Sequence, residues 1–324
     1  MRRGQDDISN QPNNIQVVIL ANAYRPRRPL QAWPCAVLLL LCGAVFAKPP
    51  RATVTQPFDG VTFTQELRDD PPLRLYWVQV DLDNPRIHLR VCRGGAAPTG
   101  LGDWETTLLP VSKIAQREHL DVAVNGNYFA PKDTKILFGT MIPYFDGNPA
   151  KCVGWTVCDG QILSLHPLGL DFSTLVINRG GRAFIRRLVA PPAGAWGAVS
   201  GIAVLQDGRN VGSDLAPAPR TAVGLDSDAK QLTLFTVDGR RPGYSMGLSL
   251  KQLADEMRKL GCTSAISLDG GGSSTLVIRR HQYWAPVNTP SDGHQLAVPL
   301  CIERPVADAL GIVVDPPPGQ PAAK

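Results

Sequence analysis

Two neighbouring segments in the first third of the chain alternate between hydrophobic and polar positions. Residues 73–82 alternate in part and residues 87–91 alternate cleanly, with Asp83-Asn84-Pro85 between them. Successive side chains of a strand point to opposite faces, so this period of two is typical of strands that bury one face. The two segments are therefore predicted to form a β-hairpin.

Short apolar runs separated by turn residues continue along most of the chain. Asp159-Gly160 and Asp207-Gly208 are typical of turns between such runs. Further strands are predicted at residues 122–124, 153–157, 161–165, 175–177, 198–205, 222–225, 232–237, 265–268 and 276–278. So many short strands indicate a β-rich fold.

Helical patterns are few. Residues 250–260 place their apolar side chains on one face, Ser249 can cap the helix with Gln252 in a capping box, and Gly261 can end it. A weaker helix is predicted at residues 111–118. The fold class is therefore α+β, with one β-rich domain of mixed or antiparallel sheets and a few packed helices over residues 48–314.

Composition excludes a disordered chain and gives no sign of nucleic-acid binding. The 324 residues are 44% hydrophobic and 19% charged, so a sizeable core can form. The net charge is +5, but five of the basic and only two of the acidic residues lie within residues 1–47. The rest of the chain is close to neutral, so no nucleic-acid partner is expected.

The first 47 residues are predicted to be a leader that contains a secretory signal at residues 25–47. Arg25-Pro26-Arg27-Arg28 precedes an apolar run that ends in Val45-Phe46-Ala47, typical of a cleavage site. The run is short for a membrane span, so no stable span is expected after cleavage. We expect an exported protein, periplasmic or extracellular; a retained anchor or a lipoprotein site at Cys42 are the alternatives. Residues 315–324 are predicted to be a disordered, proline-rich tail.

Export would permit disulfides. Five cysteines lie outside the leader, an odd number, and Cys152 and Cys158 are the simplest pair to bridge. The sequence has no Cys-x-x-Cys, which argues against a zinc ribbon or a thioredoxin-like redox site.

Polar and glycine-rich clusters repeatedly follow the predicted strands, where backbone amides and carboxylates can face a common site. The five clusters are Asn125-Gly126-Asn127-Tyr128-Phe129, Pro219-Arg220-Thr221, Asp238-Gly239-Arg240-Arg241, Asp269-Gly270-Gly271-Gly272-Ser273-Ser274-Thr275, and Glu303-Arg304-Pro305. The fourth is the strongest, because three glycines let amide groups approach a phosphate or sugar oxygen while Asp269 adds a carboxylate. A tight turn between two buried strands is the alternative.

Two other patterns carry less weight. Gly243-Tyr244-Ser245-Met246-Gly247 matches the nucleophile pattern of serine hydrolases, with Asp269 and His294 following in triad order. Ser245 lies about eight residues past the predicted strand, however, which does not fit a strand-to-helix elbow. The histidines never approach the spacing of metal ligands.

Arg220, Arg240 and Arg304 each stand beside a turn residue rather than in a basic run. A single arginine of this kind is usually solvated or paired with a carboxylate. Three that converge would suit an anionic sugar ester, because guanidinium groups match phosphate oxygens.

These clusters, in this order, resemble the phosphodiester glycosidase family. The resemblance rests on residues 122–129, 219–224, 237–240, 268–275 and 303–307 and is firmest over residues 104–314. It implies a hydrolase that cleaves a sugar-1-phosphodiester at the anomeric carbon, on envelope or exopolysaccharide glycans. Asp308 departs from the asparagine expected there, which puts substrate preference or activity in question.

The resemblance also implies roles for named residues. Asp269 or Glu303 would act on the sugar side, and Asp238 is the third candidate catalytic carboxylate. The phosphate would be bound by Arg220, Arg240, Arg304 and the amides of Gly270, Gly271, Gly272 and Ser273. Asn125 and Asp238 would hold sugar hydroxyls or, alternatively, a divalent cation such as calcium or magnesium. No cofactor is expected to be required, and the oligomeric state stays open. The competing class is a non-catalytic carbohydrate-binding or exopolysaccharide-assembly module of the same fold.

Overall fold

The computed structural model describes residues 51–97, 104–137, 140–165, 172–190, 192–292 and 302–317. Its strands are β1 (Arg51–Phe58), β2 (Val61–Asp69), β3 (Pro72–Asp81), β4 (Ile87–Arg93), β5 (Thr106–Thr107), β6 (Val122–Asn125), β7 (Phe129–Pro131), β8 (Lys135–Leu137), β9 (Thr140–Ile142), β10 (Pro149–Cys152), β11 (Trp155–Cys158), β12 (Gln161–Leu165), β13 (Phe172–Ile177), β14 (Ala183–Arg186), β15 (Gly197–Gln206), β16 (Arg209–Asn210), β17 (Arg220–Leu225), β18 (Gln231–Val237), β19 (Ser264–Ser267), β20 (Leu276–Arg280), β21 (Tyr283–Pro286) and β22 (Asp308–Val314). The helices are α1 (Val111–Arg117), α2 (Leu250–Lys259) and the short 3₁₀ helix η1 (Gly271–Ser273).

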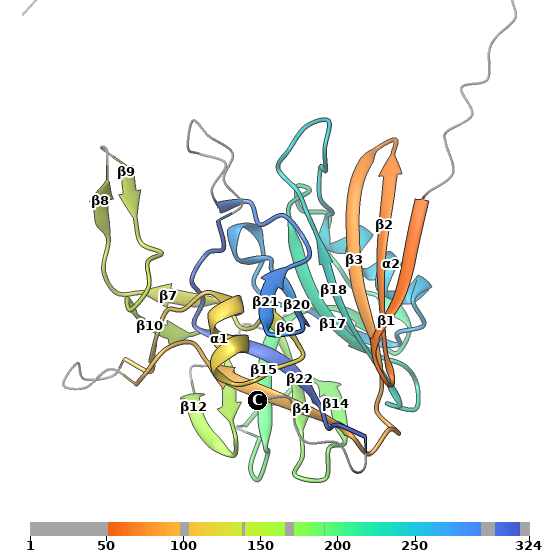
Figure 1. Ribbon diagram of the computed structural model, residues 1–324, viewed down its shortest axis with the longest axis horizontal. Coiled ribbons are helices and arrows are strands. Elements are labelled where there is room, and N and C mark those ends of the chain that lie inside the picture. The colour runs from red at the N-terminus through yellow and green to blue at the C-terminus, as the bar shows by residue number, and fades with distance from the viewer. Residues whose placement is uncertain are drawn as a thin grey trace, which may run out of the picture. The chain divides into compact units, whose positions relative to one another are not determined.

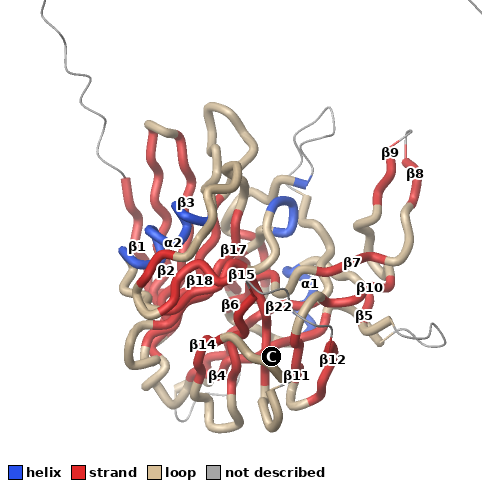
Figure 2. The backbone as a smooth tube through the Cα atoms, turned by 180° about the vertical axis from the view of Figure 1, so that it is seen from behind, coloured by secondary structure: helices blue, strands red, loops and turns tan. Residues whose placement is uncertain are grey.

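Every described strand pairing is antiparallel, which confirms the β-rich class (Figure 1). The large sheet has the order β1-β2-β3-β18-β17-β19-β15-β11-β12, with β13, β14 and β16 joined to it off this path. A second sheet has the order β21-β20-β6-β22-β4. Smaller sheets are formed by β5-β10-β7 and by β8-β9, the latter pair extending away from the main body in the view of Figure 2.

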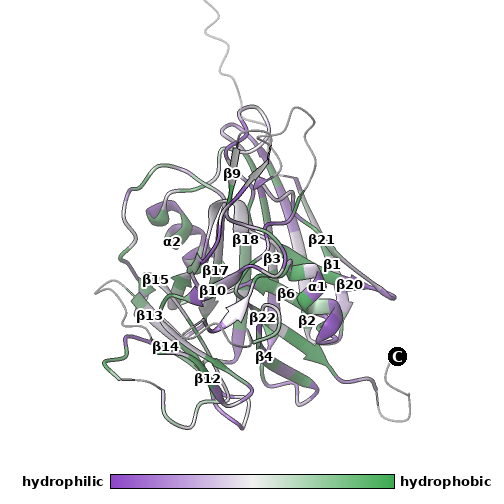
Figure 3. Cartoon of the chain, turned by 90° about the vertical axis from the view of Figure 1, so that its left-hand side faces the viewer, coloured by the Kyte–Doolittle hydropathy of each residue, from purple (hydrophilic) through white to green (hydrophobic). Residues whose placement is uncertain are grey.

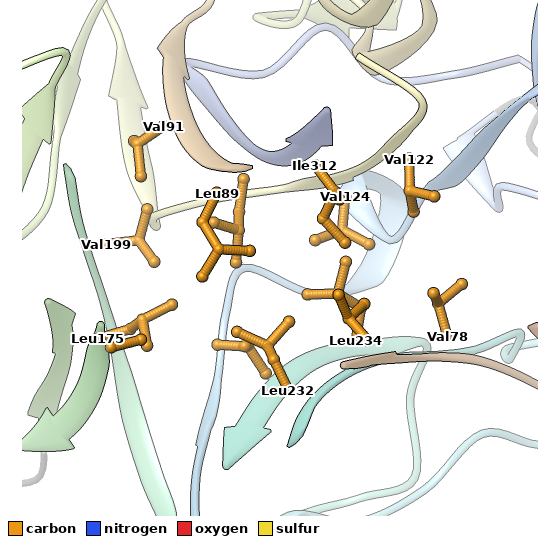
Figure 4. Packing of buried hydrophobic residues seen from close by; sticks show 14 of the residues in the cluster. Val78, Leu89, Val91, Val122, Val124, Leu175, Val199, Leu232, Leu234 and Ile312 are labelled. Carbon is orange, nitrogen blue, oxygen red and sulfur yellow. The ribbon is translucent and has the colours of Figure 1, made fainter. Parts of the chain in front are cut away.

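The main core lies between the large sheet and the five-stranded sheet. Val78 and Leu234 come from the large sheet, and Val124 and Ile312 from the other, and their side chains gather in one layer (Figure 4). Each of these side chains is fully buried. Burying side chains of this size is worth about 1.5–3 kcal/mol each, so this layer fixes how the two sheets pack on one another.

The helices cover the outer faces of the two sheets. In α2, Leu253 and Met257 pack in one cluster with Leu75 and Phe235 of the large sheet. In α1, Ile114 belongs to the cluster that includes residues of β6 and β22. Figure 3 shows both hydrophobic and hydrophilic residues on each helix, as expected for helices with one face on a sheet. No helix of the described residues is long and apolar enough to cross a bilayer.

The helix α2 begins and ends where the sequence predicts. Ser249 accepts a hydrogen bond from the Gln252 amide at 3.2 Å, and the Gln252 side chain accepts one from the Ser249 amide at 2.8 Å. Gly261 follows with φ of +90°, a backbone conformation that glycine adopts at low cost. The capping box is therefore confirmed.

The predicted hairpin of residues 73–82 and 87–91 is wrong. β3 pairs with β2 and β18 in the large sheet, whereas β4 pairs with β22 in the five-stranded sheet. The turn at residues 83–85 thus carries the chain from one sheet to the other. Alternation shows which face of a strand is buried but does not identify its partner.

The simplest disulfide is wrong as well. Cys152 and Cys158 are buried as free thiols on β10 and β11, as are Cys92 and Cys262. Cys301, the leader with Cys42, and residues 318–324 of the predicted tail lie outside the described residues.

Candidate active site

The polar clusters lie close together because they begin or follow strands whose ends are neighbours at one end of the large sheet. Arg220 opens β17 and pairs in register with Val237, the last residue of β18. Ala222 of the same strand pairs with Ser267, the last residue of β19. Neighbouring antiparallel strands run in opposite directions, so the end of one strand lies beside the beginning of the next. The segments after β18 and β19 therefore lie beside the beginning of β17.

Asn125, at the end of β6, ties three of the clusters together from within the protein. Its amide nitrogen donates to the backbone oxygen of Asp269 at 2.7 Å. Its side-chain oxygen accepts from the Thr221 hydroxyl at 2.7 Å and from the Thr275 amide at 3.2 Å. The side chain is fully buried, so in this conformation it holds the glycine turn in place. A contact from Asn125 to a sugar hydroxyl stays a prediction.

Two of the three glycines of the turn face an arginine guanidinium. A Cβ atom on Gly270 would meet the backbone oxygen of Pro219 first, at 3.0 Å, and would lie 3.8 Å from the aliphatic Cδ of Arg220. One on Gly271 would lie 3.0 Å from both terminal nitrogens of Arg240.

The third glycine completes the pattern, since a Cβ atom on Gly272 would overlap the guanidinium of Arg304. Arg304 also donates to Asp292 from Nε at 3.0 Å and lies 3.8 Å over the ring of Tyr144. The absence of side chains at Gly271 and Gly272 thus makes room for two guanidinium groups beside the turn.

Asp269 stands at the base of this turn, partly exposed. Its Oδ1 accepts from the Gly270 amide at 2.9 Å. Burial raises the pKa of Asp269 to about 6, an effect that Ser273, the charge of Arg304, the Gly270 amide and the charge of Arg240 partly offset. The carboxylate is therefore charged at neutral pH and lies in the field of two arginines.

The Ser273 hydroxyl is buried near Asp269 but makes no hydrogen bond of ordinary geometry with the described residues.

Arg220 is prepared to receive an anion. It donates to the backbone oxygens of Leu248 at 3.0 Å and Ala216 at 3.1 Å, and it has no carboxylate partner among the described residues. Burial lowers the pKa of Arg220, the nearby Tyr128 opposes this, and the charge of Arg240 adds to it. A guanidinium that is desolvated and repelled by another cation gains more than usual from a phosphate.

Asp238 is placed behind the turn as a hub of hydrogen bonds. Its oxygens accept from Tyr244 at 3.1 Å, from Tyr76 at 3.3 Å and from Asn288 at 3.1 Å. The Asn288 side chain also donates to the backbone oxygen of Ser274, which links Asp238 to the glycine turn. Burial raises the pKa of Asp238 to about 6, opposed by these donors. A catalytic role for Asp238 stays a prediction.

Glu303 has different neighbours from Asp269. Its Oε2 accepts from the Ser112 amide at 2.9 Å, in the first turn of α1. Burial raises the pKa of Glu303, opposed by Ser112 and by the charge of Lys113. In this conformation Glu303 caps the helix and makes no direct contact with Asp269.

The serine-hydrolase alternative receives no support. Ser245 is fully buried; its hydroxyl donates to the backbone oxygen of Asp238 at 2.6 Å and accepts from the Arg74 amide at 3.1 Å. These bonds close a turn and leave the hydroxyl no free approach to a substrate. His294 lies outside the described residues.

Three residues of the site were missed by sequence reasoning. Asp292 accepts a hydrogen bond from Arg304, and the Tyr144 ring lies under its guanidinium. No motif in the sequence around Asp292 or Tyr144 predicts these contacts. Tyr128 lies near both Asp269 and Arg220, and burial together with the charge of Asp269 raises its pKa to about 12. The Asn-Gly-Asn-Tyr-Phe cluster was the available signal for Tyr128.

A divalent cation finds no obvious set of ligands. Within the described part of the chain, no three His, Cys, Asp or Glu side chains gather in a way that could hold a metal ion. Asn125 and Asp238, the suggested oxygen ligands, use their oxygens on donors of the protein. The cation therefore stays an untested alternative.

The contact between Gly271 and Arg240 leads to a testable expectation. Gly271 has φ of +64° and Gly208 has φ of +74°, but no atom lies within 4 Å of the position of a Cβ on Gly208. Alanine at either position should cost about 1 kcal/mol of unfolding free energy, because a side chain is strained at positive φ. Only Gly271→Ala should displace Arg240 and raise KM, by about tenfold. Urea unfolding and steady-state kinetics of both variants check this, and an equal rise in KM would contradict it.

Comparison with known sequences identifies relatives over the site region. The sequence profile of the phosphodiester glycosidase family matches residues 118–313, more than half of the chain. The N-acetylglucosamine-1-phosphodiester alpha-N-acetylglucosaminidase of Mus musculus is 35% identical over 91 residues, and that of Homo sapiens is 33% identical over 91 residues. In both cases the match covers 26% of this chain and 17% of the relative's length.

The fold has solved counterparts. The catalytic domain of the zebrafish N-acetylglucosamine-1-phosphodiester alpha-N-acetylglucosaminidase, auto-inhibited by its pro-peptide, superposes with a TM-score of 0.57 at 19% identity. The superposition covers 82% of this chain and 88% of that domain. A hypothetical protein from Synechocystis superposes with a TM-score of 0.50 at 14% identity, covering 82% of this chain and 64% of that protein. On the family profile and the shared fold, this chain belongs to the phosphodiester glycosidase family.

Proposed function

We propose that this protein is an exported hydrolase that cleaves a sugar-1-phosphodiester at the anomeric carbon and releases a sugar and a phosphomonoester. The observation that supports it best is the glycine turn: Gly271 faces the guanidinium of Arg240, Gly272 faces that of Arg304, and Asp269 stands at its base. Cations around a turn with one carboxylate suit a substrate that has a phosphate on one side of the broken bond and a developing positive sugar on the other.

The arginines act on the phosphate side. As the bond between the anomeric carbon and the phosphate oxygen breaks, negative charge grows on the departing phosphate. Arg220 and Arg240 have no carboxylate partner among the described residues, so their charges are available to stabilise it. Arg304 is already paired with Asp292, so its charge is partly neutralised, and its role is to occupy the space beside Gly272.

Asp269 acts on the sugar side. Its carboxylate stabilises the oxocarbenium-like carbon and takes a proton from the water whose oxygen forms the new bond to that carbon. The electron pair of the broken bond leaves with the phosphate. A phosphomonoester is a good leaving group, so a strong general acid is not needed, which fits a site where Glu303 is engaged at α1.

The first substrate to test is an N-acetylglucosamine-1-phosphodiester, the class named in the mammalian relatives. Envelope or exopolysaccharide glycans with phosphodiester-linked sugars are the proposed natural substrates, reached by export through the predicted signal. N-terminal sequencing of the mature protein should place cleavage after Ala47. A mature chain that keeps residues 1–47 would contradict this step.

The position of bond cleavage separates this activity from that of a phosphodiesterase. We expect turnover of UDP-N-acetylglucosamine in water enriched in heavy oxygen to place the label in the free sugar and none in UDP. Mass spectrometry of both products measures this. Label in the nucleotide would show attack at phosphorus and contradict the proposal, and binding without release of sugar would favour the non-catalytic carbohydrate module.

A further inference from the structure

Four arginines gather on one hairpin that the proposed reaction does not use. β13 and β14 pair in register from Thr174 with Arg186 to Ile177 with Ala183, and we call residues 172–187 the arginine hairpin. It carries Arg179, Arg182, Arg186 and Arg187, and no aspartate or glutamate occurs between Phe172 and Gln206. None of the four arginines has a carboxylate partner among the described residues. The hairpin therefore presents uncompensated positive charge.

The alternation along β14 points the charge outward. Ala183 is buried and Ile185 packs against the main core, whereas Arg182, Phe184 and Arg186 are exposed. The Asn178 side chain accepts from the amides of Gly180 at 2.9 Å and Arg182 at 3.0 Å, which holds the turn in one shape. A rigid hairpin loses little conformational entropy when it binds a partner.

Two hollows flank this hairpin. One of about 470 Å³ has Val176, Phe184 and Leu188 among its apolar residues, and Arg186 and Arg187 are the only charged residues in the described part of its lining. Arg186 lies 4.6 Å over the Phe184 ring. A hollow of this size admits a sugar-sized group, with its C–H faces on the apolar residues and its acidic substituents toward the arginines.

The second hollow, of about 740 Å³, lies at the turn end of the hairpin and includes Arg179 and Arg182. Arg179 lies 4.9 Å over the ring of Trp196. Of its other charged residues, Lys230 pairs with Asp83 at 3.0 Å, and Asp228 leaves one negative charge that offsets one of the two arginines. Asn178 lines both hollows, so one extended chain could contact the two in succession.

β13 connects the hairpin to the candidate active site. Phe172, at its start, packs edge-on against Tyr128 at 5.7 Å, and Tyr128 lies near Asp269. Ile177, at the other end of β13, lies about 17 Å from Phe172 along the strand and leads into the turn of the arginine hairpin. β14, the second strand of this hairpin, lies near the lower edge of the view in Figure 1. This span corresponds to a few linked sugars.

We propose that the arginine hairpin is a secondary binding surface for a polyanionic glycan chain, which it holds while another part of the same chain reaches Asp269. The identification of the bound chain as a phosphodiester-linked glycan rests on the proposed function. The positive charge of the hairpin and the two hollows beside it are observed independently of that function. The attraction is electrostatic, so it weakens as salt screens the arginines.

The test compares two triple variants. One carries Arg182→Gln, Arg186→Gln and Arg187→Gln; the matched control carries Arg51→Gln, Arg209→Gln and Arg280→Gln, which remove the same charge from exposed positions elsewhere. Fluorescent poly(glycerol phosphate) is titrated at low and high salt, with neutral dextran as the uncharged probe. Poly(glycerol phosphate) has no anomeric carbon, so the proposed reaction cannot cut it, and Asp269 is kept in both sets.

We expect the hairpin variant to bind poly(glycerol phosphate) about tenfold more weakly at low salt, and the control variant to bind it like the parent. The hairpin variant should still turn over UDP-N-acetylglucosamine at the wild-type rate. Unchanged polymer binding by the hairpin variant, or equal losses in both variants, would overturn the inference. So would tighter hairpin-dependent binding of single-stranded DNA or of anionic lipid vesicles than of the polymer.

The two proposals fail in different ways. A wild-type protein that binds poly(glycerol phosphate) through the hairpin but never cleaves UDP-N-acetylglucosamine would reject the proposed reaction and keep the binding surface. Cleavage without hairpin-dependent binding would do the reverse.

Discussion

Asp269→Asn is expected to lower kcat by between about 10² and 10⁴ while leaving the fold intact. The amide can still accept from the Gly270 amide, so the turn keeps its hydrogen bond, but it can neither take a proton nor stabilise a positive carbon. Release of free sugar from UDP-N-acetylglucosamine measures the activity, and thermal unfolding shows whether the variant remains folded.

Glu303→Gln provides the matched carboxylate control. Glutamine keeps an oxygen for the Ser112 amide, so α1 should stay capped and turnover should stay near the wild-type rate. Loss of activity in Glu303→Gln with little loss in Asp269→Asn would reverse the two roles. Near-normal turnover in both variants would remove the carboxylates from the mechanism.

The pH dependence follows from the same carboxylate. Asp269 has a pKa of about 6 and acts in its ionised form. The value of kcat/KM should therefore rise as pH increases through about 6 and level off above it. Asp269→Asn should abolish this limb in whatever residual activity remains. A wild-type profile that is flat between pH 5 and about 8 would show that Asp269 does not titrate in the free enzyme.

Local features of the sequence predicted local structure well. The capping box of Ser249 and Gln252 concerns residues three apart, and it forms as expected. The strand at residues 161–165 is found with the same bounds, because its short apolar run and the Asp159-Gly160 turn before it are contained in a short window. Contacts between distant segments are a different matter.

The sequence did not reveal which strands pair with one another or which distant side chains make contact. The alternation of residues 73–82 and 87–91 is real, but whether two strands pair depends on sheets assembled from the whole chain. In the same way, Arg304 could be singled out beside its turn residue, whereas its pairing with Asp292, 12 residues earlier in the chain, could not be predicted. The order of the polar clusters at strand ends did predict a contact between distant segments. Antiparallel neighbours place the end of one strand beside the beginning of the next, so clusters at these positions come together.

Asp308 carries the largest expected effect on stability. It is fully buried at the start of β22; its Oδ1 accepts from the Asn127 amide at 2.8 Å, and its Oδ2 has no partner among the described residues. A Cβ on Gly126 would lie 2.6 Å from this carboxyl, so the group is tightly enclosed. Burial raises the pKa of Asp308 to about 7, with the Asn127 amide opposing and the charges of Asp269 and Glu105 adding to it.

This pKa makes stability depend on pH in a defined direction. In the unfolded chain Asp308 ionises near the ordinary aspartate pKa of 3.8, so between about pH 4 and pH 7 the folded protein holds one more proton than the unfolded one. The free energy of unfolding therefore falls as pH rises, by about 1.4 kcal/mol per pH unit, or on the order of 4 kcal/mol in all. The stabilisation is fully present below about pH 4 and lost above about pH 7.

Asp308→Asn should remove this dependence, because a carboxamide does not titrate and still accepts from the Asn127 amide. The unfolding free energy of the variant minus that of the wild type, measured in urea, should increase by on the order of 4 kcal/mol from pH 4 to pH 8. Asp121→Asn is the contrasting control: Asp121 is buried and paired with Arg279, so its loss should destabilise the protein at neutral pH. A difference for Asp308→Asn that stays constant with pH would mean that its carboxyl ionises in the folded protein much as it does in the unfolded chain. A buried carboxylate whose one hydrogen-bond partner is the Asn127 amide would then have to be stabilised by a further group that its described surroundings do not supply.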